Sequence, residues 1–249
     1  MKTITFVAYN RADYTKQVLH TIEAAQPEGY EMFISLDPGD DATEQVVRDF
    51  LLTTKIKTVL VKNEERLGVN YNNLNAFKTA VEAGSDFNVA IEDDTPISPD
   101  AFQLADWFYN HGHEYLVLNF FTFGMVEQEP LSLMECNDFC PWAWCFSKKA
   151  FERYIHPGWM GDERGWDWSI NKVMQAFNLK SLRPVLSRSG NIGRDLGTHC
   201  TPELFDNDFP TGLVMSTQKH GDDFKIIPKE LAATLLDSQQ GHRMLALLR

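Results

Sequence analysis

The chain has 249 residues, with 23 Lys or Arg against 35 Asp or Glu, and its formal net charge is −12. Such an acidic chain offers no clustered basic surface for phosphate groups, so we exclude a nucleic-acid partner. A hydrophobic fraction of 43% and a charged fraction of 23% are typical of a globular protein and exclude a disordered one.

Strand and helix patterns alternate along the first 91 residues. Short apolar runs predict strands over residues 3–8, 32–36, 58–61 and 87–91. Apolar residues at helical spacing fill the intervals, and Asp13 is the expected N-cap of the first helix. Asp41 and Glu44 form a capping-box-like start for the second helix, and Gly84 ends the third.

This alternation predicts an α/β fold, with a mixed, mostly parallel sheet flanked by helices in a single domain. Ligands of such sheets bind beyond the carboxyl ends of the strands. The segments expected at that edge are residues 9–11, 37–41 and 92–94, which contain one arginine and several carboxylates. We therefore expect the functional site there.

The pattern changes after residue 98. Ser98 and Pro99 predict the cap and first turn of a helix that runs through Phe108, and residues 115–145 are aromatic-rich and less regular. Further helices are expected over residues 147–155, 170–177 and, as two short amphipathic segments, 226–249.

Neither a membrane span nor a signal peptide is evident. No apolar stretch approaches the roughly 20 residues that a bilayer requires, and the first residues read as a buried strand. We therefore expect a cytoplasmic protein. The four cysteines, at positions 136, 140, 145 and 200, lack paired zinc spacing and are expected to be buried free thiols.

Three consecutive carboxylates, Glu92, Asp93 and Asp94, follow the fourth predicted strand. Like charges this close repel one another unless a cation lies among them. Mn²⁺ or Mg²⁺ fits, because such an ion takes one or two carboxylates and completes its shell with substrate phosphates. We interpret the triplet as a metal site, and the alternative is a solvated acidic turn.

Tyr9, Arg11 and Asp37 follow the first two predicted strands. If a nucleotide lies across this edge, Asp37 can accept hydrogen bonds from a base or ribose and Arg11 can pair with a phosphate or a base. The alternative is an ion pair between Arg11 and Asp37. Neither a G-x-x-x-x-G-K-[ST] nor a G-x-G-x-x-G loop is present, which counts against kinases and dinucleotide dehydrogenases and favours a metal as the carrier of diphosphate charge.

Asp167 stands between Trp166 and Trp168 at the start of a predicted helix. Aromatic rings stack on the apolar faces of sugars, and a carboxylate between them can take a hydroxyl proton as a general base. The alternative is a capping residue beside two core tryptophans.

The segment from Gly190 to His199 is a glycine-rich polar loop typical of a mobile lid. His199 is a candidate metal ligand or phosphate donor, and Thr198 can offer its hydroxyl to a phosphate.

Taken in order, these motifs resemble the GT-A glycosyltransferases, and within them most closely the N-acetylglucosaminyltransferase I type. The resemblance covers roughly residues 3–206 and is carried by segments 7–11, 34–39, 89–94, 97–102, 166–168, 182–188 and 197–199.

The resemblance implies an inverting, metal-dependent transferase that moves a hexose such as GlcNAc from a UDP-sugar to an acceptor hydroxyl, with Mn²⁺ or Mg²⁺ as its cofactor. It assigns Asp94 to the metal, Asp93 to the ribose and Glu92 to the donor sugar. It places Arg11 and Asp37, next to Tyr9, at the nucleoside, Asp167 as the base and Thr198 at a phosphate. It also implies a nucleotide-sugar-binding half over residues 1–110, an acceptor-binding half over 111–225 and a helical tail over 226–249.

Two other classes of function remain open from the sequence. A non-catalytic carbohydrate-binding protein would bind sugars regardless of metal or UDP, and a sugar nucleotidyltransferase would release pyrophosphate instead of UDP. The donor sugar, the acceptor and the oligomeric state are not determined by the sequence.

Overall fold

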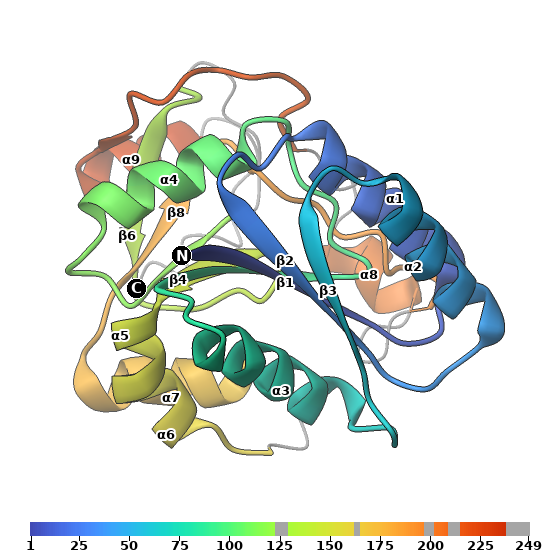
Figure 1. Ribbon diagram of the computed structural model, residues 1–249. Coiled ribbons are helices and arrows are strands. Elements are labelled where there is room, and N and C mark those ends of the chain that lie inside the picture. Colours follow the sequence, from blue (N-terminus) through green and yellow to red (C-terminus); the bar gives the residue numbers. More distant parts are fainter. Residues whose placement is uncertain (123–128, 162–164, 197–201, 209–214, 238–249) are drawn as a thin grey trace.

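The computed structural model describes residues 1–122, 129–161, 165–196, 202–208 and 215–237 (Figure 1). Its strands are β1 (Lys2–Ala8), β2 (Tyr30–Leu36), β3 (Lys57–Lys62), β4 (Phe87–Glu92), β5 (Val117–Asn119), β6 (Ser132–Cys136), β7 (Trp144–Ser147), β8 (Ser181–Pro184) and β9 (Lys225–Ile226). Its helices are α1 (Ala12–Ala24), α2 (Asp41–Thr53), α3 (Gly68–Glu82), α4 (Ala101–His111), α5 (Lys148–Ala150), the π-helix Phe151–Ile155, α6 (His156–Gly158), α7 (Asp167–Phe177), α8 (Pro202–Asp208) and α9 (Lys229–Asp237).

The strands of the described residues form one sheet in the order β3-β2-β1-β4-β7-β5-β8-β6-β9. The first four strands pair in parallel, whereas β7 runs antiparallel to both β4 and β5. The predicted mixed, mostly parallel sheet of a single α/β domain is thus confirmed. Because β1 lies between β2 and β4, their carboxyl ends meet, with Ala8 opposite Leu36 and Val7 opposite Glu92.

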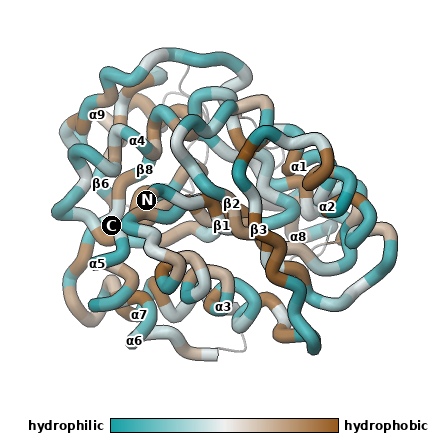
Figure 2. Tube along the Cα trace, in the orientation of Figure 1, coloured by the Kyte–Doolittle hydropathy of each residue, from teal (hydrophilic) through white to brown (hydrophobic). Residues whose placement is uncertain are grey.

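Helices cover both faces of the sheet (Figure 1), so the strands β1, β2 and β4 are buried on two sides, whereas β3 is partly exposed and β9 is exposed. Alternate residues of β1 point to opposite faces: Ile4 and Phe6 join the cluster formed with α1, α2 and α4, and Val7 joins the cluster formed with α3, the π-helix and α7. Figure 2 shows the hydrophobic colouring of β1 to β3 beside the more hydrophilic α2.

An aromatic cluster fills the second face. The ring of Phe77, on α3, meets Trp144, Trp159 and Trp166 at centroid distances of 5.5, 5.9 and 6.4 Å, close to perpendicular. Trp159 and Trp166 stack on each other at 5.3 Å. These edge and stacked contacts fix the segment that leads into α7 against the sheet.

The helix starts differ from the sequence prediction in three places. Asp13 lies inside α1, whose N-cap position is Arg11, without a side-chain cap. The helix α2 begins at Asp41, but its cap is Asp40, which accepts the backbone N–H of Thr43 at 2.6 Å, so the capping role predicted for Asp41 is wrong by one residue. The predicted cap at Ser98 is also wrong, because α4 begins at Ala101 after Asp100.

Asp100 does not cap α4 because it serves a buried ion pair. Its Oδ1 lies 2.8 Å from Nε of Arg188, and both side chains are fully buried. Nη2 of Arg188 also donates to the carbonyl of Pro130 at 2.6 Å. This pair joins the segment after β8 to the start of α4.

The remaining predictions have mixed outcomes. The helix over residues 147–155 is present as α5 and the π-helix, and the first helix of the tail is present as α9, whereas the second tail helix lies outside the described residues. Cys136, Cys140 and Cys145 are free thiols, with Cys140 partly exposed, and position 200 is not described. Among the described residues, no helix is both long and apolar enough to cross a bilayer, and the cellular location stays a prediction.

Replacement of Arg188 tests the buried pair. We expect Arg188→Gln to lower the free energy of unfolding by about 3–5 kcal/mol, because it leaves the Asp100 charge buried and unpaired. The matched control is Lys57→Gln, which breaks the exposed pair with Glu31 and should cost at most about 1 kcal/mol. Denaturant unfolding of both variants measures the difference, and equal losses would contradict the structural role of the pair.

Candidate active site

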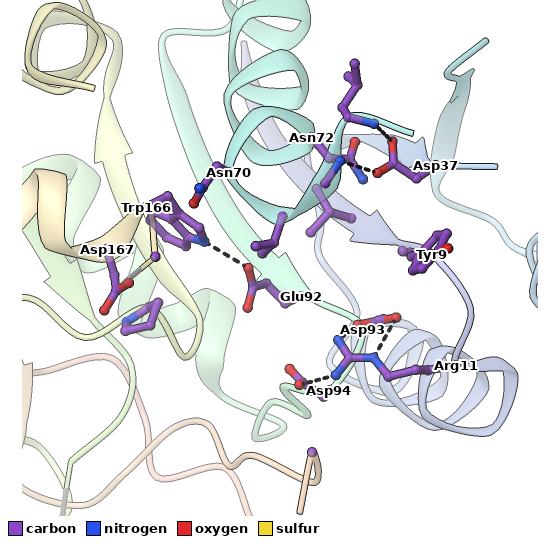
Figure 3. Close-up of a pocket in the computed structure, with 18 of the residues that line it drawn as sticks. Tyr9, Arg11, Asp37, Asn70, Asn72, Glu92, Asp93, Asp94, Trp166 and Asp167 are labelled. Carbon is purple, nitrogen blue, oxygen red and sulfur yellow. Dashed lines mark hydrogen bonds and ion pairs between the residues drawn. The ribbon is translucent and has the colours of Figure 1, made fainter. Parts of the chain in front are cut away.

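A pocket of about 760 Å³ opens at the carboxyl ends of β1, β2 and β4. It is lined by every predicted site residue that the structure describes, namely Tyr9, Arg11, Asp37, Glu92, Asp93, Asp94 and Asp167 (Figure 3). Thr198 and His199 lie outside the described residues, so their predicted roles stay predictions.

Arg11 binds two of the three carboxylates that follow β4. Its guanidinium makes a bidentate contact with Asp93, and its Nη1 lies 2.7 Å from Oδ2 of Asp94. Asp93 and Asp94 are only 2% and 7% exposed, so the alternative of a solvated acidic turn is wrong. Burial alone would lower the pKa of Arg11, but attraction by Asp94 and Asp93 outweighs it and raises the pKa.

Glu92 lines the same pocket. Its Oε1 accepts hydrogen bonds from Nδ2 of Asn73 at 2.9 Å and from Nε1 of Trp166 at 3.2 Å. Removal from bulk water, together with the charge of Asp94, raises the pKa of Glu92 to about 8. Burial likewise raises the pKa of Asp93, to about 6, although Arg11 opposes the shift. The pocket thus holds carboxyl groups whose charge depends on a nearby cation.

Asp37 stabilises the start of α3. Its carboxylate accepts the backbone N–H groups of Leu67 and Gly68 at 3.1 and 2.8 Å, and Nδ2 of Asn63 at 2.8 Å. A carboxylate at a helix N-terminus is favoured by the helix dipole. The predicted alternative of an Arg11–Asp37 ion pair is wrong, because Arg11 pairs with Asp93 and Asp94.

Tyr9 lies beside an arginine that the sequence analysis missed. The guanidinium carbon of Arg66 is 4.3 Å from the centroid of the Tyr9 ring, and both residues line the pocket. This stacked pair forms the rim next to Asp37, where a planar group can lie against it.

Asp167 is the first residue of α7, and Trp166 occupies the N-cap position, so the alternative of a capping aspartate is wrong. A Cβ on Gly165, whose φ is +126°, would lie 2.6 Å from Oδ1 of Asp167. A glycine is therefore required to bring the chain this close to the carboxylate. In Figure 3, Glu92 lies between Asp167 on one side and Arg11 with Asp93 on the other.

The residues around Asp94 fit a divalent cation. Its Oδ1 is buried and has no hydrogen-bond partner within the part of the chain that the structure describes, which is unusual for a buried polar atom. Within the described residues no group of three or more His, Cys, Asp or Glu side chains could hold a metal. Two adjacent carboxylates are nevertheless sufficient for Mg²⁺ or Mn²⁺ when phosphate oxygens supply the other ligands.

The sequence analysis also missed the polar residues that α3 brings to the pocket. Asn70, Tyr71 and Asn72 line it, and Asn73 reaches Glu92. A signal was present, since several asparagines stand in one helix of which Asn72 and Asn73 are buried. Buried amides in a helix indicate a hydrogen-bonding role, because burying an amide without a partner is costly.

Comparison with known proteins places this pocket in context. The sequence profile described as Glycosyl transferase family 2 matches residues 3–154, which include β1 to β4 and the three carboxylates. No curated protein shows significant sequence similarity to the chain.

Solved structures with the same fold are distant in sequence. The mannosyltransferase PcManGT from Pyrobaculum calidifontis, in complex with GDP-Man and Mn²⁺, is 17% identical with a TM-score of 0.56, and the match covers 72% of this chain and 53% of that one. S. aureus TarS 1–349 in complex with UDP-GlcNAc is 15% identical with a TM-score of 0.53, and the match covers 96% of this chain and 68% of that one. The chain thus spans about half the length of the mannosyltransferase.

Two stacked tryptophans allow a matched test of the Glu92 contact. Trp166→Phe removes one donor to Glu92, whereas Trp159→Phe removes a buried N–H for which the described residues offer no partner. Both changes lose similar ring volume, so we expect Trp166→Phe to lower the free energy of unfolding by about 1–3 kcal/mol more than Trp159→Phe. Chemical denaturation of both variants measures this difference, and an equal loss would show that the hydrogen bond contributes nothing.

Proposed function

Because the chain belongs to glycosyl transferase family 2, we propose that it is a metal-dependent inverting glycosyltransferase, which moves a hexose from a UDP-sugar to an acceptor hydroxyl. One observation carries the proposal. Side chains from the ends of β1 and β4 and from the start of α7 line a single pocket, which contains the adjacent carboxylates Asp93 and Asp94 and a separate carboxylate, Asp167. The Asp93–Asp94 pair is suited to hold a cation against a diphosphate leaving group, and Asp167 is suited to the role of proton acceptor.

The donor's nucleotide would lie along the ends of β1 and β2. The Tyr9–Arg66 pair offers a flat surface for the base, and Arg11 offers a bidentate partner for a phosphate. Asp37 already accepts three hydrogen bonds, so its main role is to hold the start of α3 beside the nucleotide. TarS with UDP-GlcNAc and PcManGT with GDP-Man show that this fold accommodates both nucleotides, and we propose UDP for this chain.

Asp94, with Asp93 beside it, would hold the divalent cation. When bound, the cation supplies charge neutralisation for the departing diphosphate. PcManGT was solved with Mn²⁺, which supports this assignment, and either Mn²⁺ or Mg²⁺ suits the oxygen donors.

Asp167 would act as the general base. It takes the proton of the acceptor hydroxyl while that oxygen forms a bond to the anomeric carbon. The bond from the anomeric carbon to the diphosphate oxygen breaks at the same time, and its electron pair leaves with the nucleotide. The separation of Asp167 from Asp93 and Arg11 across Glu92 (Figure 3) supports attack from the face opposite the leaving group, which inverts the anomeric configuration.

Exposed aromatic rings lie near the base. Tyr71 and Trp168 are 54% and 43% exposed, and both line the pocket. Such rings stack on the apolar face of a sugar, so we propose a saccharide as the acceptor.

In this proposal residues 1–110 supply most of the donor site, and residues 111–225 supply Asp167 and most of the acceptor side. The narrower resemblance to the N-acetylglucosaminyltransferase I type, with GlcNAc as the transferred sugar, remains part of the proposal.

Release of the nucleotide tests the proposed reaction. The protein is incubated with UDP- and GDP-sugars and Mn²⁺, with and without a chelator, and UDP, GDP and pyrophosphate are measured. We expect metal-dependent release of UDP from a UDP-sugar, at least slowly to water. Pyrophosphate release would indicate a nucleotidyltransferase, and sugar binding without any turnover would indicate a carbohydrate-binding protein.

Replacement of Asp167 tests the base. We expect Asp167→Asn to lower the rate of transfer by roughly 10²–10⁴-fold and to leave UDP affinity unchanged, because the amide cannot accept the proton. The control is Asp49→Asn, which changes an exposed carboxylate on α2 that contacts Gln45 and should leave the rate unchanged. Full activity of Asp167→Asn would show that the base is wrongly assigned.

A further inference from the structure

Arg11 already pairs with Asp93 and Asp94, the carboxylates that the proposed function assigns to a divalent cation. Its guanidinium contacts both oxygens of Asp93 and one oxygen of Asp94. The Arg11 side chain is 17% exposed, and those of Asp93 and Asp94 are 3% and 10% exposed. One protein cation therefore balances two buried anions at the position where the proposed function requires a metal.

Arg11 and a divalent cation cannot share Asp94 without cost. Nη1 of Arg11 holds Oδ2 at 2.7 Å, and the partnerless Oδ1 belongs to the same carboxylate. Two positive groups bound to one carboxylate repel each other, and burial weakens the screening of that repulsion. The space is also tight, since a Cβ on Gly193 would lie 2.5 Å from Oδ2.

An Arg11 side chain displaced from Asp94 gains a second anionic partner when a nucleotide is bound. Besides Asp93, its other contacts among the described residues are weak: Nη1 lies 3.4 Å from the carbonyl of Leu196, and the guanidinium carbon lies 6.0 Å from the centroid of the Tyr14 ring. A diphosphate in the pocket would offer the planar oxygen pairs that a guanidinium binds best. A metal that arrives alone leaves Nη1 of Arg11 without an anionic partner and Asp93 as the one described carboxylate in contact with the guanidinium.

We propose that Arg11 is an internal counter-cation that the metal displaces from Asp94, and that the nucleotide diphosphate accepts the released guanidinium. This inference rests on the proposed function and adds a property to it: the metal and the nucleotide bind cooperatively, and Arg11 supplies part of the coupling. Arg11 is thus a positioning residue that keeps the metal site closed to free cations until a diphosphate is present. The competing arrangement leaves Arg11 fixed on both aspartates, with the metal bound through Oδ1 alone.

Titration of Mn²⁺, followed by the electron paramagnetic resonance signal of the free ion, separates the two arrangements. The wild type, Arg11→Gln and Arg11→Lys are each titrated in the absence and in the presence of UDP. Arg66→Gln is the matched control for the titration without UDP alone, because it removes the same charge from the same pocket without touching Asp93 or Asp94, whereas Arg66 belongs to the proposed site of the base. Circular dichroism checks the folding of each variant, and Arg11→Lys, which keeps the charge but cannot make the bidentate contact, provides the measurement if Arg11→Gln does not fold.

We expect Arg11→Gln to bind Mn²⁺ without UDP about tenfold more tightly than the wild type, a factor within the usual range of coupling between sites. Arg11→Lys should fall between the two, and Arg66→Gln should stay within about twofold of the wild type, since its exposed charge is screened. The factor by which UDP tightens Mn²⁺ binding should be larger in the wild type than in Arg11→Gln.

Equal or weaker binding of Mn²⁺ by both Arg11 variants would overturn the inference and leave the proposed function intact. Tighter binding by Arg66→Gln to the same extent would also overturn it, because the effect would then be one of general charge. If neither Mn²⁺ nor UDP binds to the wild type, the proposed function fails together with the inference.

Discussion

The site depends on the placement of three adjacent carboxylates in a buried position at the end of a central strand. Charged groups are costly to bury unless each is paired or hydrogen-bonded. Here Arg11 pairs with Asp93 and Asp94, while Asn73 and Trp166 donate to Glu92. Each partner comes from a different element, so the requirement to satisfy one triplet fixes the relative positions of β1, α3 and the start of α7.

The aromatic cluster gives this arrangement its rigidity. Trp166 both stacks on Trp159 and donates to Glu92, so the packing of the second face determines where Asp167 begins α7. Phe77 contacts the same tryptophans from α3, the helix that also supplies Asn73. Aromatic packing and polar contacts to Glu92 therefore position the same two elements, α3 and the start of α7. A pocket built in this way holds Asp167 and the carboxylates Asp93 and Asp94 on separate supports, which suits the proposed displacement with inversion.

Much of the fold follows from the sequence because apolar runs at strand spacing alternate with helical stripes through β4. The edge where the ligand would bind also follows, since parallel strands bring Arg11, Asp37 and Glu92 together whatever the loops do. The partners of the charged side chains could not be predicted in the same way. Arg11 reaches a carboxylate 82 residues away, and Asp100, at the N-cap position of α4, pairs its side chain with Arg188 and does not cap the helix. Long-range partners depend on tertiary geometry, which local patterns do not encode.

The central claim is that the carboxylates after β4 bind a divalent cation together with a nucleotide diphosphate. Crystals grown with Mn²⁺ and UDP test it most directly through the anomalous scattering of manganese. The account predicts an anomalous peak in contact with Asp94, with the diphosphate beside it and the Arg11 guanidinium turned from Asp94 toward a phosphate. A nucleotide bound away from these carboxylates, or a manganese peak that does not contact Asp94, would contradict it.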